Sequence, residues 1–257
     1  MTDGQVAMKI LNLWIKQPDH RMVACSSVNL VSGYGIEGDQ NARVGSPRQV
    51  LLIDQPSLQL FGLQPGDLSE NILVDQCCAD WTSGQILNLG SAFIRLTFLC
   101  EPCFRLESIH PGLARQIKGR RGFLGMVVKS GSVTVGDGVT PTGYTLPVIA
   151  DNPKGRFQAL VARIPPGKVM TTADLVLALG VSDAYYRVIP TFIKQSLARL
   201  PVHRIVAANG TLLLRHMPDQ AERLMREGVD VVQGRVGDRD RWQPEHFYEG
   251  LPLSLLS

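Results

Sequence analysis

The chain carries Leu200-Pro201-Val202-His203-Arg204-Ile205 near the end of its most basic segment. Residues 154–215 hold nine Lys and Arg against two Asp, whereas residues 1–150 hold twelve basic and twelve acidic residues. The formal net charge of +3 therefore arises in the second part of the chain. A basic segment in an otherwise neutral protein is typical of proteins that bind the phosphate backbone of a nucleic acid. A solvated basic face without that function is the alternative.

The pattern before this stretch predicts two helices joined by a short turn that contains glycine. Thr171 or Thr172 can cap the first helix, and Asp183 can cap the second, which we expect over residues 184–197. Such a pair predicts a helix-turn-helix in an α-rich, winged-helix-like domain. Pro190 falls inside the second predicted helix, where it removes a backbone hydrogen bond and should produce a kink.

The first part of the chain has the pattern of short strands separated by Gly, Pro and Asp. The expected strands lie within Met22–Val31, Gln49–Ile53, Asn71–Val74, Ala92–Leu99, Met126–Lys129 and Val133–Val135. Ser130-Gly131-Ser132 predicts a hairpin between the last two, and Pro111–Ile117 predicts a helix. We therefore predict a closed or nearly closed β-barrel with minor helices.

These patterns predict two domains. We expect the barrel over residues 1–140, a linker over 141–153 that is rich in Pro and Gly, a DNA-binding domain over 154–235 and a tail over 236–257. No signal sequence and no apolar run of about 20 residues is present, so we expect a cytoplasmic protein that does not enter a membrane.

The five cysteines do not resemble a secreted disulfide framework, because their number is odd and they are bunched at 25, 77, 78, 100 and 103. We expect them to be reduced. Cys100-Glu-Pro-Cys103 lacks the βαβ setting of a thioredoxin motif. Adjacent Cys77 and Cys78 have poor spacing for a tetrahedral zinc site.

An ordered set of motifs in the second part resembles the DNA alkyltransferases. The set consists of Ile164–Val169, Ala184–Val188, Leu200–Ile205, Asn209-Gly210 and Arg226–Val229. Val202 stands where those enzymes have the alkyl-accepting cysteine, and no cysteine follows Cys103. Only a thiolate has the nucleophilicity that alkyl transfer requires, so the chain is not an alkyltransferase. It resembles the alkyltransferase-like proteins, which bind damaged DNA without repairing it directly.

This resemblance implies double-stranded DNA with a damaged base as a partner. Arg187 matches the arginine that enters the base stack in place of the flipped nucleotide, although a surface arginine that contacts phosphate is the alternative. The implied DNA contacts are Thr171, Thr172, Tyr185, Arg187 and Arg204. Val202 and His203 are the implied lesion-pocket residues, and Arg204 would also tie the pocket to neighbouring carbonyls.

The first part resembles MOSC domains, named after the C-terminal domain of molybdenum-cofactor sulfurase, over roughly residues 5–140. The motifs are Gly35–Asp39, Arg48-Gln49-Val50, Ser69–Ile72, Glu101-Pro102-Cys103 and Arg121–Val139. The resemblance implies a barrel that holds the molybdenum cofactor, with Cys103 as metal ligand and catalytic residue. Arg48, Arg120 and Arg121 would bind the cofactor phosphate and Asn71 the pterin.

Together the resemblances imply a protein that recognises damaged bases by a non-reactive, base-flipping domain. Its MOSC domain would be a molybdenum-dependent oxidoreductase that reduces N-hydroxylated bases with the help of a redox partner. One alternative is a catalytically silent barrel in a protein that flags alkylguanine for other repair proteins. Another is a sulfur carrier that uses a persulfide on Cys103.

Overall fold

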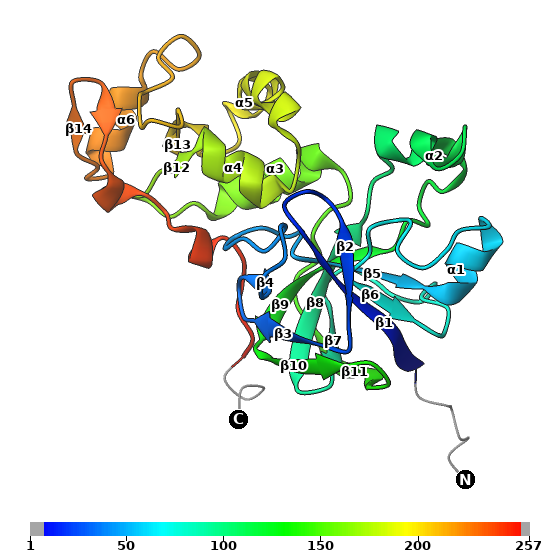
Figure 1. The fold of residues 1–257 in the computed structure, drawn as a ribbon. Coiled ribbons are helices and arrows are strands. Elements are labelled where there is room, and N and C mark those ends of the chain that lie inside the picture. Colours follow the sequence, from blue (N-terminus) through cyan, green and yellow to red (C-terminus); the bar gives the residue numbers. More distant parts are fainter. Residues whose placement is uncertain (1–7, 253–257) are drawn as a thin grey trace. The chain divides into compact units, whose positions relative to one another are not determined.

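The computed structural model describes residues 8–252, which divide into two compact units (Figure 1). The first unit runs to Ile149 and takes up the chain again at Gly250, and the second covers Ala150–Glu249. Strand β11 extends over Gly138–Thr145, so residues 141–145 continue a strand and are not part of a linker. The boundary expected at residue 140 thus moves toward Ile149.

The main sheet of the first unit closes on itself, because β11 pairs with both β7 and β1. Its order is β11-β7-β8-β9-β5-β6-β1-β2. The remaining strands of this sheet are β1 (Met8–Lys16), β2 (Met22–Cys25), β5 (Val50–Asp54), β6 (Ile72–Val74), β7 (Gln85–Leu89), β8 (Ala92–Leu99) and β9 (Phe123–Lys129). Closure removes the unpaired edges that an open sheet would expose. The strand-rich domain with minor helices agrees with the sequence prediction.

The core lies inside this closed sheet. Buried side chains from most of its strands form one cluster, which includes Leu52, Ile72, Ile94 and Leu96. Gly122, just before β9, has φ +88°, and a Cβ atom there would lie 2.3 Å from the carbonyl oxygen of Leu52. Only glycine allows this close approach. It also places Cys100 next to β9, since the amide of Cys100 donates to the carbonyl of Gly122 at 2.9 Å.

The hairpin expected at Ser130-Gly131-Ser132 does not form, because β10 (Gly131–Thr134) pairs with β3 (Ser27–Val31) and not with β9. A three-stranded sheet of β10, β3 and β4 (Gly35–Ile36) results. Helices α1 (Gln55–Leu60) and α2 (Leu113–Gln116) and the 3-10 helix η1 (Phe104–Ser108) complete the unit. The side chain of Asp54 caps α1 by accepting from the amide of Ser57 at 2.7 Å.

The second unit is built from short helices and very short strands. Its helices are α3 (Pro153–Arg163), α4 (Thr172–Leu179), η2 (Asp183–Arg187), α5 (Ile189–Ser196), η3 (Val202–Arg204), α6 (Gln220–Arg226), η4 (Asp238–Asp240) and η5 (Pro244–His246). The strands are β12 (Met170–Thr171), β13 (Ile205–Val206), β14 (Val231–Val232) and β15 (Arg235–Val236). β12 and β13 pair in parallel, and β14 and β15 form a hairpin.

The segment after α4 differs from the single kinked helix expected over residues 184–197. Gly180, in the left-handed region at φ 61°, ends α4, and a 3-10 helix then precedes α5. Pro190 lies in the first turn of α5, where a missing amide hydrogen leaves no intrahelical bond unmade. Asp183 does not cap either helix, since Ser182 holds the N-cap position of η2 without a side-chain bond. The proline therefore begins a helix where a kink was expected.

The segment expected as a tail is part of the core of the second unit. Trp242 and Phe247 are buried in the same hydrophobic cluster as Phe157 and Val202, and Tyr248 packs against it. The domain that begins at α3 therefore extends past residue 235. None of the helices in residues 8–252 is long and apolar enough to cross a membrane.

Candidate functional site

Cys103 lies at the point where the chain leaves β8 and enters η1. It is the N-cap residue of η1 in an extended conformation, and its half-buried side chain packs against a cluster that includes Trp14 and Leu106. All five cysteines are free thiols in the structure. Among residues 8–252, no group of three or more His, Cys, Asp and Glu side chains is arranged to hold a metal ion.

Charged side chains of both signs share an electrostatic environment with this cysteine. Burial lowers the pKa of Lys16, at the end of β1, and the charges of Arg105 and Arg121 lower it further. Asp39 and Cys103 act on the pKa of Lys16 in the opposite direction. These five side chains are thus close enough to interact electrostatically. Lys16 and Arg105 are not among the site residues expected from the sequence, although Arg105 follows Cys103 by only two residues.

Two of the predicted cofactor residues meet at Cys100 and Glu101. Arg48 donates through Nη2 to Sγ of Cys100 at 3.7 Å, and its Nη1 lies 3.8 Å from a carboxylate oxygen of Glu101. Arg121 donates through Nη1 to the carbonyl of Glu101 at 2.6 Å, while its Nε is buried and has no partner among the described residues. Burial raises the pKa of the Cys100 thiol, and the charges of Arg121 and Arg48 oppose that shift.

Asn71 is occupied by protein partners. Its carbonyl oxygen accepts from the amide of Leu51 at 3.0 Å, and its amide donates to the carbonyl of Trp14 at 3.2 Å and to Asp39 at 2.8 Å. The side chain is 2% exposed. Asn71 therefore orients the buried carboxylate of Asp39, which also accepts from the amide of Lys16 at 2.7 Å. Its expected contact with a pterin would require these bonds to open.

Arg120, the remaining predicted cofactor residue, is exposed in the turn between α2 and β9. Its backbone amide donates to the carbonyl of Ile117 at 2.8 Å. The structure thus brings Arg48, Arg121 and Cys103 to one region and adds Lys16 and Arg105 to them.

In the second unit one carboxylate binds both residues that follow Val202. Glu227 accepts from Nε of Arg204 at 2.8 Å and lies 2.8 Å from Nε2 of His203. Arg204 also donates to the carbonyl of Ile164 at 2.6 Å, which is the expected tie to a neighbouring carbonyl. These bonds occupy its guanidinium within the protein, so the expected contact of Arg204 with DNA stays a prediction that would require some of them to open. The Arg204 hydrogen bonds lower the pKa of Glu227 to about 2, and burial lowers that of His203.

The two expected lesion-pocket residues are buried. Val202 has no exposed surface and packs in the core cluster with Phe157 and Ile189. His203 is 5% exposed, and its Nδ1 has no hydrogen-bond partner among the described residues. A damaged base could contact Val202 only if neighbouring side chains moved.

The expected DNA contacts before this point differ in exposure. Thr171 is buried and caps α4, since its hydroxyl accepts from the amide of Asp174 at 3.1 Å. Thr172 and Tyr185 are half-buried, and Arg187 at the end of η2 is exposed. The guanidinium of Arg187 forms no hydrogen bond or ion pair with another residue of the described part. Of these residues, Arg187 is the one most available to a ligand.

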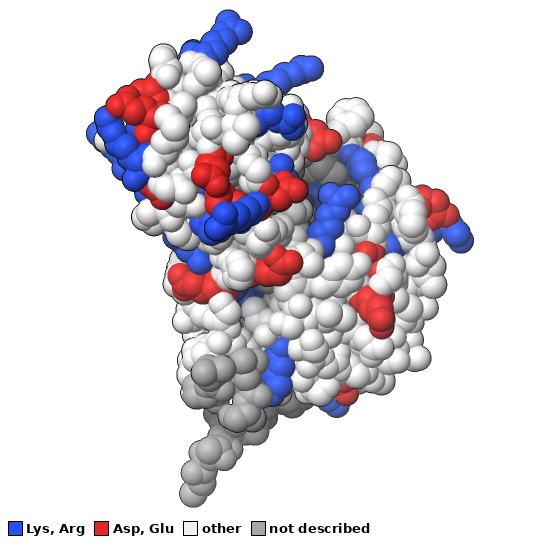
Figure 2. All heavy atoms as spheres, turned by 90° about the vertical axis from the view of Figure 1, so that its left-hand side faces the viewer, with Lys and Arg blue, Asp and Glu red and all other residues white. Residues whose placement is uncertain are grey.

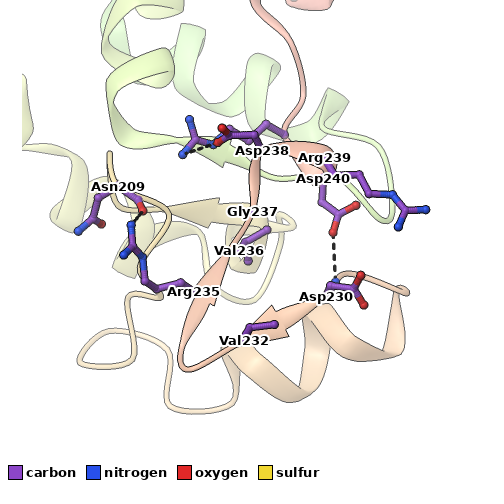
Figure 3. Close-up of a pocket in the computed structure, with 10 residues that line it drawn as sticks. Asn209, Asp230, Val232, Arg235, Val236, Gly237, Asp238, Arg239 and Asp240 are labelled. Atoms are coloured by element: carbon purple, nitrogen blue, oxygen red, sulfur yellow. Dashed lines mark hydrogen bonds and ion pairs between the residues drawn. The ribbon is translucent and has the colours of Figure 1, made fainter.

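A pocket of 410 Å³ lies between the β14–β15 hairpin and η4 (Figure 3). Its charged lining residues are Asp230, Arg235, Asp238, Arg239, Asp240 and Arg241. Figure 3 shows Arg235 turned toward the carbonyl of Asn209 and Asp240 toward the amide of Asp230, bonds of 2.7 and 3.1 Å. Figure 2 likewise shows acidic and basic side chains mixed on the face it presents. The lining charges balance, which gives this pocket no preference for an anion.

Comparisons with known proteins give one family match. Residues 39–140 match the model of the MOSC domain. No curated protein matches the chain. The first part of the chain thus contains a MOSC domain.

Solved structures resemble the chain at low similarity. YiiM from Escherichia coli is 18% identical with a TM-score of 0.45, over 74% of this chain and 93% of that one. The YUAD protein from Bacillus subtilis is 18% identical with a TM-score of 0.45, over 52% and 94%. Atl1 from S. pombe, solved with damaged DNA containing O6-carboxymethylguanine, is 25% identical with a TM-score of 0.33, over 36% and 95%.

Proposed function

We propose that the MOSC domain holds the molybdenum cofactor through Cys103 and reduces N-hydroxylated bases, and that the second unit binds DNA with a damaged base. The observation that carries the first half is the position of Cys103 among Lys16, Arg105 and Arg121. These side chains place positive charge near the thiol, and a soft thiolate ligand suits a transition metal. A phosphate-bearing cofactor is a polyanion that this field attracts.

The residues present fit such a cofactor. The buried Nε of Arg121 lacks a partner among the described residues, so it can donate to an anionic group. Lys16 and Arg48 carry further positive charge in the same region. When bound, the cofactor supplies a metal centre that exchanges two electrons with a substrate.

The choice between the two neighbouring cysteines follows from burial. Cys100 is 3% exposed, and burial raises the pKa of its thiol. It therefore remains a neutral thiol and a poor ligand at neutral pH. The side chain of Cys103 is half-buried and is therefore more accessible than that of Cys100. Cys103 is thus the ligand that we assign, with Arg48 held against Cys100 and Glu101.

The second half of the proposal rests on Arg187 and Val202. An exposed guanidinium without a protein partner can stack in a base pair's place and donate hydrogen bonds there. Val202 has no nucleophilic atom, so binding cannot lead to alkyl transfer. The basic residues of 154–215 would supply contacts to phosphate that do not depend on sequence.

One observation favours the alternative of a silent barrel that flags lesions. Asn71, expected to contact the pterin, is fully engaged with Leu51, Trp14 and Asp39. A barrel without this contact would bind the cofactor less tightly. In that case only the second unit would have a ligand.

The test is the molybdenum and pterin content of the protein purified from its own host. We expect both in the wild type and in Cys77→Ser, which changes an exposed cysteine elsewhere in the unit. We expect neither in Cys103→Ser. Absence of metal from the wild type would leave the lesion-flagging function. A persulfide on Cys103, detected by mass spectrometry, would instead support sulfur carriage.

A further inference from the structure

The helix η1 presents a large aromatic side chain to solvent directly after Cys103. Phe104 is 89% exposed, more than any other large apolar side chain in the described part of the chain. Burying a phenyl ring gains free energy, so a ligand that covered this ring next to Cys103 would be bound more tightly for it.

The exposure of Phe104 does not arise from a loose loop. Leu106, two residues later, is 2% exposed and anchors η1 in a hydrophobic cluster. The carboxylate of Glu107 accepts from the amides of Gly112 at 2.7 Å and Ala114 at 3.1 Å. These contacts fix η1 to the start of α2, so the ring stands on a rigid support.

The residue that follows Phe104 is an arginine. Arg105 is exposed, and its guanidinium forms no hydrogen bond or ion pair with another residue in the part that the structure describes. Its charge acts on Lys16, which also senses Cys103. Arg105 and Cys103 thus both lie within electrostatic range of Lys16. An aromatic face and a free guanidinium in consecutive positions match the two parts of a nucleotide, its base and its phosphate.

We propose that Phe104 and Arg105 form a nucleotide-binding element beside Cys103, in which the ring stacks on the base and the guanidinium pairs with the phosphate. The inference rests on the proposed function and specifies its substrate as a nucleotide, free or within a DNA strand. Stacking accepts any base, because every base has a π-face. Arg105 adds the requirement for a phosphate, which a guanidinium binds through two parallel hydrogen bonds.

The test measures binding to the full chain at fixed salt by calorimetry, with AMP, adenosine and ribose 5-phosphate as probes. Phe104→Ala should weaken AMP and adenosine about tenfold and leave ribose 5-phosphate unchanged. Phe104→Trp should retain binding. Arg105→Gln should weaken AMP and ribose 5-phosphate and leave adenosine unchanged. Leu60→Ala, which removes another exposed apolar side chain, and Arg115→Gln on α2 are the matched controls.

The source of the nucleotide is distinguished with a short single-stranded oligonucleotide. If Phe104→Ala loses affinity for AMP but not for the oligonucleotide, the ligand is a free nucleotide. If it loses as much or more affinity for the oligonucleotide, the ligand is a strand. Either result supports the proposal. It is overturned if the wild type binds none of the probes, or if Phe104→Ala and Arg105→Gln bind them like the controls. Molybdenum content, measured on the same samples, separates this failure from that of the proposed function.

Discussion

The guanidinium of Arg204 donates two hydrogen bonds to the carboxylate of Glu227, from Nε at 2.8 Å and from Nη2 at 2.7 Å. A bidentate pair of this kind fixes both planes and is stronger than a single neutral hydrogen bond. The same carboxylate also holds His203. One residue of the turn after α6 therefore orients the two side chains that follow Val202.

We expect the second unit to lose stability in acid through Glu227. Its pKa falls from 4.5 to about 2 in the folded protein, chiefly through its hydrogen bonds to Arg204. A lowered carboxyl pKa contributes stability that is fully present above pH 4.5 and is lost as the pH falls toward 2. The contribution is roughly 3 kcal/mol at most. Denaturant titrations between pH 7 and 2 measure it.

Glu227→Gln should remove most of this pH dependence, and Glu222→Gln, on the exposed face of α6, should retain it. His203 adds a smaller loss that begins below pH 6.5, because burial lowers its pKa and protonation then favours the unfolded chain. Equal slopes for the wild type and Glu227→Gln would contradict this assignment.

Cys103→Ser should abolish reduction of N-hydroxylated bases and leave DNA binding intact. A neutral hydroxyl is a poor substitute for a thiolate on a soft metal. The cysteine and Arg187 lie in separate compact units, so their free energies should be nearly additive. Activity assays and DNA titrations on the same preparation provide the measurement. Reduction at the wild-type rate by Cys103→Ser would rule out this ligand.

Arg187→Ala should remove the preference for DNA with an alkylated guanine and retain salt-dependent binding to undamaged duplex. Phosphate contacts elsewhere in the basic segment would maintain the salt-dependent binding to undamaged duplex. The ratio of the two dissociation constants, at one salt concentration, is the quantity to measure. Arg199→Ala changes another exposed arginine of the segment and should weaken both duplexes equally. An unchanged ratio in Arg187→Ala would make Arg187 a phosphate contact only.

No methyl group should move from methylated DNA to the wild-type protein, as mass spectrometry of the intact chain can show. Val202→Cys should not be labelled by a thiol reagent in the folded protein, because position 202 has no exposed surface. The same thiol should react once denaturant is added. The chain has other free cysteines, so the label is located by peptide mass spectrometry, and rapid labelling at position 202 of the folded variant would show that the pocket opens without a ligand.

The sequence predicts local features better than it predicts pairings. Ala92–Leu99 was expected as a strand and is β8 with the same bounds. Its apolar side chains, such as Ile94 and Leu96, recur every second position, which is the period of a strand. The strand that pairs with Gly131–Thr134 could not be predicted from such a local pattern. Its ladder to Ser27–Val31 joins residues about a hundred positions apart, and a flanking turn signal points to the nearer strand.

The candidate site shows the same limit. Cys103 and Arg121 belong to recognisable motifs, whereas Lys16 lies at the end of β1, far from both in the sequence, and only the folded sheet brings it within their electrostatic range. Motifs also do not report which polar groups are already paired. Arg204 and Asn71 matched binding positions, yet their partners Glu227 and Asp39 occupy them inside the protein.

Pro190, in the first turn of α5, keeps η2 and α5 from forming one continuous helix. Because the proline nitrogen carries no hydrogen, one continuous α-helix from Asp183 to Ser196 would lack a backbone hydrogen bond, with or without a ligand. The amides of η2 should thus exchange with solvent faster than those in the last turn of α5. Arg187, at the end of η2, can then change its direction by rotating one 3-10 turn, without unwinding the helix that anchors Ile193 in the core.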